Sequence, residues 1–224
     1  MTTTASGSEA GGILVGQRRS AARTGIALAV LFAVAASASL WFALAARNDD
    51  EPLPVIATLP DFSLTEASGR AVTRQDLSGH PWVADLVFTQ CGGICPTMTA
   101  AMSRLVASST DLPQVRFVSI SVDPERDTPE ALTAYAERFK ADRSRWLFLT
   151  GEEAAIRSLA TQGLKLPVAD GDPSQGEDDI LHSQRFVLVD AQSQVRGTYD
   201  VRDQEAMFKL RGDLVRLTEA EAAS

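Results

Sequence analysis

The sequence contains few residues that bind transition metals: two cysteines, Cys91 and Cys95, and two histidines, His80 and His182, among 224 residues. A structural zinc site normally takes four protein ligands, most often cysteine and histidine. Only one of the two histidines is expected near the cysteines, because His80 precedes the 82–88 strand and so lies at its opposite end. Two cysteines and one histidine leave a zinc site without its fourth ligand, which argues against a structural zinc domain. The thiol chemistry of the chain therefore rests on Cys91 and Cys95.

Positive charge is also scarce. The chain has 21 Lys and Arg against 29 Asp and Glu, and after residue 46 the counts are 18 and 28, a net charge of −10. Nucleic-acid binding depends on lysine and arginine that neutralise phosphates. This balance argues against a nucleic-acid partner. An acidic surface repels anionic lipid and tolerates cations or a basic protein partner.

Charge is absent altogether from Gly25–Ala46, a run of 22 residues. An uncharged, largely apolar run of this length can cross a bilayer as one helix. Arg18, Arg19 and Arg23 precede it, and the acidic residues 49–51 follow it. The positive-inside rule therefore predicts a single-pass protein of the cell inner membrane, with a cytoplasmic N-terminus and a domain in the periplasm or another extracytoplasmic space.

A cleaved signal peptide is the alternative, because residues 36–38 and 43–45 both resemble small-residue cleavage sites. The length of the run and Trp41 near its outer end favour an uncleaved anchor, and either alternative exports the domain. The expected organisation is a disordered cytoplasmic tail over residues 1–24, a transmembrane helix over 25–46, a linker over 47–58 and a globular domain over 59–224.

Within the domain, apolar runs alternate with segments of helical periodicity, which predicts an α/β sandwich. The sequence contains no internal repeat. We expect strands at residues 59–64, 71–73, 82–88, 115–122 and 146–149, and a hairpin over 183–190 and 195–199. We expect helices at 96–106, 128–139, 151–164 and 204–217, a turn at 76–80 and an acidic loop at 165–180.

The two cysteines fall where the 82–88 strand passes into the next helix. Pro96 suits the first turn of a helix, where its missing N–H costs nothing. Cys95 is then expected at the N-cap and Cys91 in the loop before it. The partial positive charge of a helix N-terminus predicts acidic, reactive thiols at both positions.

Two structural interpretations compete with this one. Buried, inert cysteines are common in protein cores, but Gly92 and Gly93 indicate a flexible loop and not a packed element. A permanent structural disulfide is the stronger competitor. It would close a loop of only five residues, which gives little entropic stabilisation. A disulfide here would therefore serve a chemical reaction more than the stability of the fold.

Three motifs carry a resemblance to a known family. They are FTQCGGICP at residues 88–96, SVDPERDTP at 121–129, and LHS at 181–183 ahead of FVLVD at 186–190. In this order they resemble the Sco/SenC family of copper-binding thioredoxin-fold proteins, over about residues 55–217. Many members have a proline directly after the first cysteine, where this chain has Gly92. The resemblance implies a thioredoxin-like three-layer sandwich that follows an N-terminal transmembrane helix.

The resemblance also implies a ligand set. Two thiolates, from Cys91 and Cys95, suit Cu(I), and one added imidazole also accommodates Cu(II). The family motif places its histidine at His182, and the long preceding loop would let His182 fold across the cysteines. The alternative for His182 is a surface residue without a role.

Other residues were weighed as contributors to the site. Asp123, at the end of a buried strand on the same sheet edge as Cys91, is expected beside the metal ligands, although Asp-Pro is also ordinary turn chemistry. His80 is expected to be a solvated turn residue at the opposite end of the central strand. Met98 and Met102, one helical turn apart, are expected in the core before they are considered as copper ligands.

The predicted function is a membrane-anchored copper metallochaperone that assists assembly of the binuclear copper site of cytochrome c oxidase. Its expected partner is oxidase subunit II or another copper-dependent respiratory protein. The alternative is a thiol-disulfide reductase that keeps the client's cysteines reduced, with Cys91 attacking and Cys95 resolving. A peroxidase of the peroxiredoxin type is weaker, because Thr89 and Gln90 offer no positive charge to a peroxidatic thiol.

Overall fold

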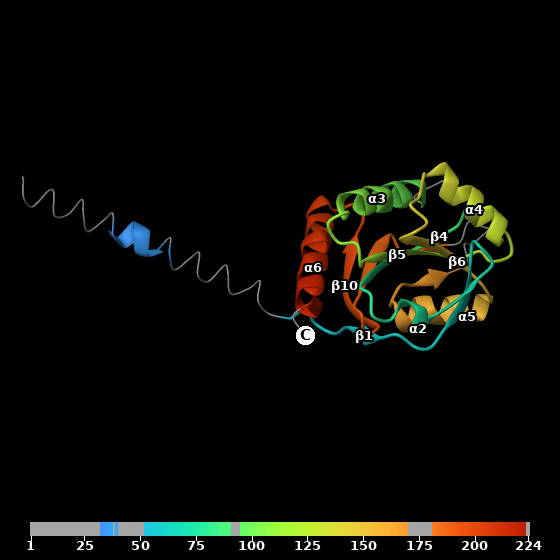
Figure 1. Ribbon diagram of the computed structural model, residues 1–224, viewed down its shortest axis with the longest axis horizontal. Helices are drawn as coiled ribbons and strands as arrows, with labels where there is room; N and C mark the ends of the chain where they lie inside the picture. Colours follow the sequence, from blue (N-terminus) through green and yellow to red (C-terminus); the bar gives the residue numbers. More distant parts are fainter. Residues whose placement is uncertain (1–31, 38, 40–51, 91–94, 170–180, 223–224) are drawn as a thin grey trace, which may run out of the picture. The chain divides into compact units, whose positions relative to one another are not determined.

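The computed structural model describes residues 32–37, 39, 52–90, 95–169 and 181–222 (Figure 1). The chain divides into two compact units, residues 1–52 and 53–224. In the first unit, residues 32–37 are helical, and most of the predicted transmembrane segment lies outside the described residues. Among the residues that are described, no helix has both the length and the apolar character that crossing a membrane requires.

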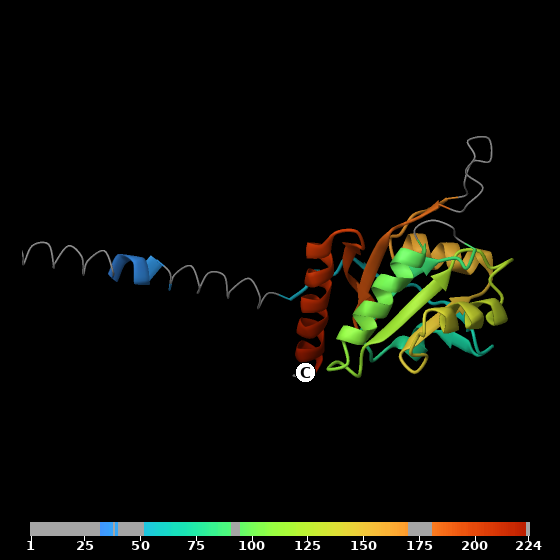
Figure 2. The ribbon, with the colours of Figure 1, turned by 90° about the horizontal axis from the view of Figure 1, so that it is seen from above.

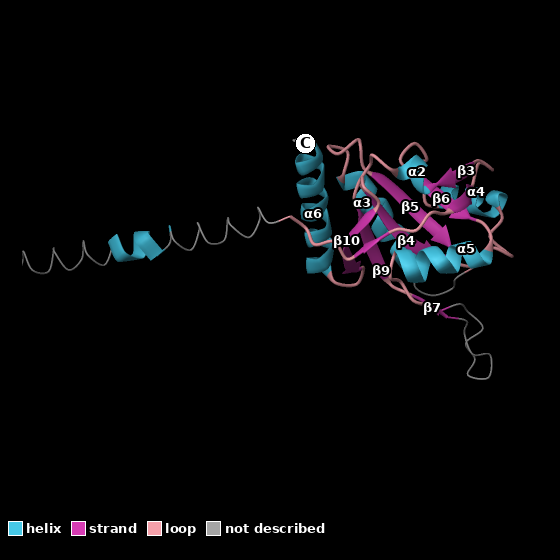
Figure 3. Cartoon of the chain, turned by 90° about the horizontal axis from the view of Figure 1, so that it is seen from below, coloured by secondary structure: helices cyan, strands magenta, loops and turns pink. Residues whose placement is uncertain are grey.

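The second unit is built on an eight-stranded sheet in the order β1-β10-β9-β4-β5-β6-β2-β3, with a separate two-stranded pair, β7-β8 (Figure 3). The strands are β1 (Ala57–Thr58), β2 (Ser63–Glu66), β3 (Ala71–Thr73), β4 (Trp82–Val87), β5 (Arg116–Ser121), β6 (Trp146–Thr150), β7 (Val168–Ala169), β8 (Leu181–His182), β9 (Arg185–Val189) and β10 (Gln194–Asp200). The helices are α2 (Arg74–Leu77), α3 (Cys95–Ser108), α4 (Pro129–Arg138), α5 (Glu153–Ser158), the π-helical turn η1 (Leu159–Gly163) and α6 (Gln204–Ala222).

Strand β4 lies at the centre of the sheet, and all six of its residues are buried. It pairs in parallel with β5, from Trp82 opposite Arg116 to Val87 opposite Ser121, and antiparallel with β9. Because β10 is in turn antiparallel to β9, β10 runs in the same direction as β4. The carboxyl ends of β4, β5 and β10 and the start of β9 therefore meet at one edge of the sheet.

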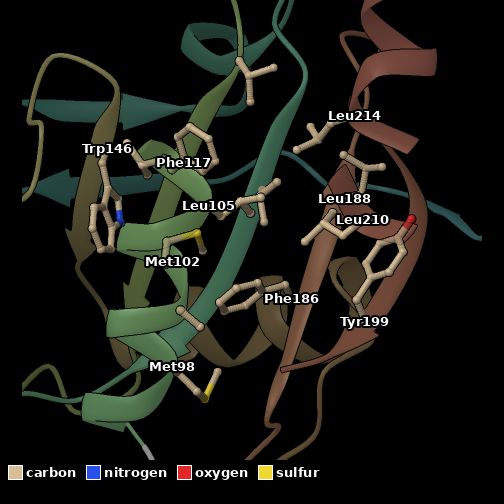
Figure 4. Packing of buried hydrophobic residues seen from close by; sticks show 14 of the residues in the cluster. Met98, Met102, Leu105, Phe117, Trp146, Phe186, Leu188, Tyr199, Leu210 and Leu214 are labelled. Atoms are coloured by element: carbon tan, nitrogen blue, oxygen red, sulfur yellow. The ribbon is translucent and has the colours of Figure 1, made fainter. Parts of the chain in front are cut away.

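Helices cover both faces of the sheet, which makes three layers and confirms the predicted α/β sandwich (Figures 1 and 2). One core lies under α3, α4 and α6. Its members include Met98, Met102, Leu105, Phe117, Trp146, Phe186, Leu188, Tyr199, Leu210 and Leu214 (Figure 4). The other core lies under α2, α5 and η1. Full burial of one side chain of this size is worth about 2 kcal/mol.

Helix α4 begins as the sequence predicts. Thr128 has an extended backbone, and its Oγ1 accepts a hydrogen bond from the Ala131 N–H at 3.3 Å. Pro129 follows in the first turn, where its missing N–H leaves no intrahelical bond unmade. The cap fixes where the loop after β5 ends, and that loop contributes to the candidate site.

Several expectations need correction. The strand expected at residues 59–64 is displaced to Ser63–Glu66, and residues 59–62 form no regular element. The predicted turn at 76–80 begins as the short helix α2, because Asp76 Oδ2 accepts hydrogen bonds from both N and Oγ1 of Thr73 in a capping box. The predicted helix 151–164 changes to π geometry at Leu159, where the Leu164 N–H reaches the Leu159 carbonyl. Residues 53–58 of the expected linker belong to the domain, since Leu53 is buried and β1 pairs with β10.

One charged side chain interrupts the apolar central strand. Asp85 is completely buried, and its Oδ1 accepts a hydrogen bond of 2.6 Å from Ser119 Oγ. Trp146 Nε1 donates in turn to Ser119 Oγ at 3.0 Å. Asp85 Oδ2 has no hydrogen-bond partner among the residues that the structure describes. Burial raises the pKa of Asp85 to about 7, and the Ser119 hydrogen bond only partly opposes this.

This carboxyl predicts a pH dependence of stability that Asp85→Asn removes. In the unfolded chain an aspartate ionises near pH 4, whereas Asp85 in the folded chain holds its proton to about pH 7. The folded state then binds more protons than the unfolded state, so the free energy of unfolding falls as pH rises between these values. We expect a loss of a few kcal/mol across this window in the parent, at about 1.4 kcal/mol per unit of pKa difference.

Urea unfolding of the parent and of Asp85→Asn between about pH 4 and pH 8 measures this slope. Asp142→Asn is the matched control. The pKa of the exposed Asp142 is lowered by its hydrogen bond from Ser144, so its contribution to stability changes below this window. Equal slopes in the parent and Asp85→Asn would show that Asp85 is ionised in the folded protein.

Candidate metal and thiol site

Cys95 opens helix α3 at the edge of the sheet where β4 ends. Pro96 lies in the first turn, as predicted, and the helix boundary agrees with the expected N-cap to within one residue. The Cys95 side chain is fully buried and packs in the same core as Leu86 and Phe88. Cys91 lies outside the described residues, so the relation between the two sulfurs remains a prediction.

A buried hydrogen-bond chain fixes the first turn of α3 against α4. Thr99 Oγ1 donates to the Cys95 carbonyl at 2.9 Å, and the Tyr135 hydroxyl lies 2.6 Å from the same Thr99 oxygen. Because Thr99 uses its proton on Cys95, Tyr135 is the donor in the second bond. Burial raises the pKa of Tyr135 above its ordinary range, so the hydroxyl stays protonated and able to donate.

Asp127 ties the segment that leads into the cysteines to the loop after β5. Its carboxylate accepts from the Thr89 N–H at 3.1 and 3.2 Å and from Thr89 Oγ1 at 2.5 Å. Ser121 Oγ donates a further hydrogen bond of 2.6 Å. Asp127 is itself fully buried. Thr89, two residues before Cys91, is therefore held by a carboxylate whose oxygens are well satisfied by donors.

Asp127 is a functional residue that the sequence pattern does not single out. The pattern favours Asp123, which follows the buried strand directly, although Asp127 belongs to the same motif. Asp123 is buried, and its Oδ2 pairs with Arg126 Nε at 2.6 Å within the same loop. The signal for Asp127 is its place as the third acid of the 121–129 motif, immediately before the Thr128 cap.

His182 approaches the same edge of the sheet along the backbone. Strand β8 places His182 opposite Val168 of β7, and β9 begins three residues later at Arg185 (Figure 2). Since β9 is antiparallel to β4, the chain before Arg185 lies at the carboxyl end of β4. Three extended residues span about 10 Å. Only the backbone of His182 is described, so its role as a ligand stays a prediction.

The other candidates fall where expected or close to it. Met98 and Met102 are completely buried in the α3 core, which confirms the core interpretation (Figure 4). His80 lies before β4, at the end opposite to the cysteines. The expectation that His80 is solvated was wrong in part: the residue is half-buried, and its Nδ1 is enclosed without a hydrogen-bond partner among the described residues.

Of the three predicted ligands, the structure describes the side chain of Cys95 only. Among the described side chains, no three of His, Cys, Asp or Glu gather closely enough to hold a metal ion. The structure brings three backbone segments to one sheet edge: the start of α3, the loop from Asp123 to Asp127, and β8 with the start of β9.

Comparison with known proteins identifies relatives of this chain. The SCO1/SenC family model matches residues 51–212. A SCO1 protein homolog of Bacillus subtilis is 34% identical over 152 residues, covering 66% of this chain and 76% of the relative.

Two solved structures are similar as well. BsSco, a member of the Sco family of cytochrome c oxidase assembly proteins with an identified disulfide switch, has a TM-score of 0.65 and 29% identity, covering 75% of this chain and 98% of its own. Bradyrhizobium japonicum ScoI with copper bound has a TM-score of 0.57 and 27% identity, covering 72% and 99%.

The contacts of Asp127 and Asp123 predict that replacing them lowers the free energy of unfolding by different amounts. In Asp127→Ala, Thr89 and Ser121 lose a buried acceptor, which we expect to lower the free energy of unfolding by about 2 kcal/mol. In Asp123→Ala, the lost partner Arg126 is half exposed and can turn to water, so we expect a loss below about 1 kcal/mol. Urea unfolding compares the two variants with the parent, and equal midpoints would contradict a special role for Asp127.

Proposed function

We propose, from the premise that the chain belongs to the SCO1/SenC family, that it is a copper metallochaperone. Copper is its cargo, held by the thiolates of Cys91 and Cys95 and by the imidazole of His182. The observation that carries the proposal is the meeting of the Cys95 helix, the Asp123–Asp127 loop and the β8 backbone at one sheet edge. The similarity to ScoI with copper bound supports copper as the cargo.

The donor set fits copper in both oxidation states. Two thiolates suit Cu(I), and an imidazole added to them accommodates Cu(II). Cys95 lies at the start of a 14-residue helix, whose N-terminus carries partial positive charge, and its side chain is fully buried. The hydrogen bonds from Thr89 to Asp127 hold the approach to Cys91 in place and reduce the motion lost when a metal binds.

The proposed client is cytochrome c oxidase subunit II, or another copper-dependent respiratory protein, whose binuclear copper site receives the ion. BsSco belongs to a family of cytochrome c oxidase assembly proteins, which supports this choice. Transfer would proceed by ligand exchange, in which each client thiolate that binds copper replaces one ligand of this chain. Three ligands leave the ion open to an incoming fourth.

A second function, that of a thiol-disulfide reductase, is favoured by the disulfide switch of the similar BsSco. In it, the Cys91 thiolate attacks a disulfide of the client and forms a mixed disulfide, and one client thiolate leaves. The Cys95 thiolate then attacks Cys91 and releases the second client thiolate. The client gains two electrons, and this chain is left with a Cys91–Cys95 disulfide. The reductase does not require His182, whereas copper binding does.

We also propose the organisation expected from the sequence: a tail over residues 1–24, an anchor over 25–46, and an extracytoplasmic domain after it. We expect the full chain in a washed membrane fraction and a chain that starts at residue 47 in the supernatant, because only the former carries the 22-residue uncharged run. Mass spectrometry of the mature N-terminus accompanies the fractionation. A mature chain that begins near Ser39 or Ala46 would replace the anchor with a cleaved signal peptide.

The choice between the two functions turns on His182. In His182→Ala the nitrogen ligand is lost, so we expect Cu(II) affinity to fall by at least about tenfold while Cu(I) binding persists on two thiolates. A spectroscopic titration of the full-length, reduced chain with each ion measures this. The Cys91–Cys95 disulfide should form equally well in the variant, because the imidazole does not bring the sulfurs together.

His80→Ala is the matched control, since His80 lies at the opposite end of β4 from the cysteines. We expect it to bind both copper ions as the parent does. If His182→Ala also binds Cu(II) like the parent, the site consists of thiols only and the reductase becomes the better account. Loss of Cu(II) binding in His80→Ala would overturn the proposed ligand set.

A further inference from the structure

A groove of about 560 Å³ runs between α3 and the first turns of α6. Leu105 of α3, together with Met207 and Phe208 of α6, forms much of its apolar lining. Phe208 is 70% exposed, whereas the other described aromatic side chains of the domain are buried or partly buried. Single exposed apolar residues are ordinary, but Phe208 borders a hollow that is apolar as well.

The rim of the groove is basic. Arg104, Arg202 and Arg211 line it, and its lining contains no Asp or Glu. The whole chain, by contrast, carries a net charge of −8. The groove is therefore a local exception to an acidic molecule, and its charge is complementary to acidic groups and not to basic ones.

The three arginines differ in how far their charge is compensated. Arg202 pairs with Asp200 at 2.8 Å, and Arg211 pairs with Asp111 at 2.6 Å. Arg104 is exposed and has no ion pair or hydrogen bond within the described part of the chain. The Nη1 of Arg211 is buried and also lacks an acceptor there. Because that atom is buried, Arg104 is the one of the three rim arginines that offers uncompensated donors to an incoming carboxylate.

One end of the groove reaches the sheet edge where β4 ends, and its α3 wall is the half of that helix farther from Cys95. Strand β10 runs in the direction of β4, so Asp200 at its end and the following Arg202 come to the sheet edge that Cys91 follows. The other wall is α3 itself, which begins at Cys95. Leu105 lies ten residues further on, about 15 Å along the helix axis. A segment bound in the groove would lie along the helix that carries one thiol.

We infer that this groove docks an extended acidic segment of the protein that receives copper, with one aliphatic or aromatic side chain of that segment seated between Leu105 and Phe208. The inference deepens the proposed function, on which it rests, by assigning the client-binding surface. A carboxylate of the client segment binds Arg104. The docked client then has its own thiols held on the domain that carries copper, which raises their effective concentration.

The probe is a fluorescently labelled peptide with one leucine flanked on each side by two glutamates. Fluorescence anisotropy with the full-length chain measures its binding at low and at high salt. We expect binding that weakens as salt rises, since the rim charges are exposed. A lysine-flanked peptide and a glutamate peptide with glycine in place of leucine should both bind at least about tenfold more weakly.

Two variants locate the binding site. Arg104→Glu reverses the uncompensated charge and should raise the dissociation constant by about tenfold, and Phe208→Ala by a few fold. Both side chains are exposed, so neither change disturbs the core. Arg70→Glu is the control. Arg70 is an exposed arginine between β2 and β3, at the far end of the sheet, and its replacement should leave binding unchanged.

Copper titration of the same preparations separates this inference from the proposed function. Arg104→Glu should take up copper as the parent does while it loses the peptide. If the peptide binds the parent and Arg104→Glu equally, the docking surface is wrong whatever the copper result. Self-association of the parent in sedimentation that Arg104→Glu abolishes would also overturn it, because the groove would then hold a second copy of the chain.

Discussion

The pairing of β4 with its two neighbours is the constraint on which the rest of the domain depends. β4 is parallel to β5 and antiparallel to β9, so segments far apart in the sequence reach the same edge of the sheet. The backbone pairing of the strands brings the start of α3, the Asp123–Asp127 loop and the approach of His182 to this edge. Side-chain hydrogen bonds, such as those of Asp127 to Thr89 and Ser121, then fix them there. A register shift of one residue in β4 would turn its side chains to the opposite faces and separate these segments from their supports.

Two buried aspartates of the domain, Asp127 and Asp85, differ in the hydrogen bonds that their carboxyl groups accept. Asp127 accepts hydrogen bonds from Thr89 and Ser121, which compensate the cost of burying its carboxylate. Through these bonds it holds Thr89, two residues before Cys91, in place. Asp85 has one partner, Ser119, and one unsatisfied oxygen, and burial raises its pKa to about 7. Both aspartates are completely buried, so they differ in the number of hydrogen-bond donors around the carboxyl group and not in burial.

Local rules predicted the parts of the fold that are governed by local chemistry. Pro96 and Thr128 marked two helix starts, and the apolar run at β4 marked the central strand, because one strong local preference decides each of them. Asp127 could not be selected over Asp123 from spacing, since its partners Thr89 and Ser121 come from separate strands. Helix α2 was missed because it is one turn long, and η1 because its geometry depends on packing beneath the sheet.

Both ends of the eight-stranded sheet are closed by very short strands, β1 with two residues and β3 with three. An outer strand of ordinary length exposes a row of backbone donors and acceptors that can recruit another chain and begin cross-β polymerisation. Each terminal strand offers too short a row to template such growth, although β1 pairs with only Gln194 and Val195 of β10. Growth of the sheet by another chain would therefore have to begin on the rest of β10, which makes that strand the position where the sheet is open to a second chain.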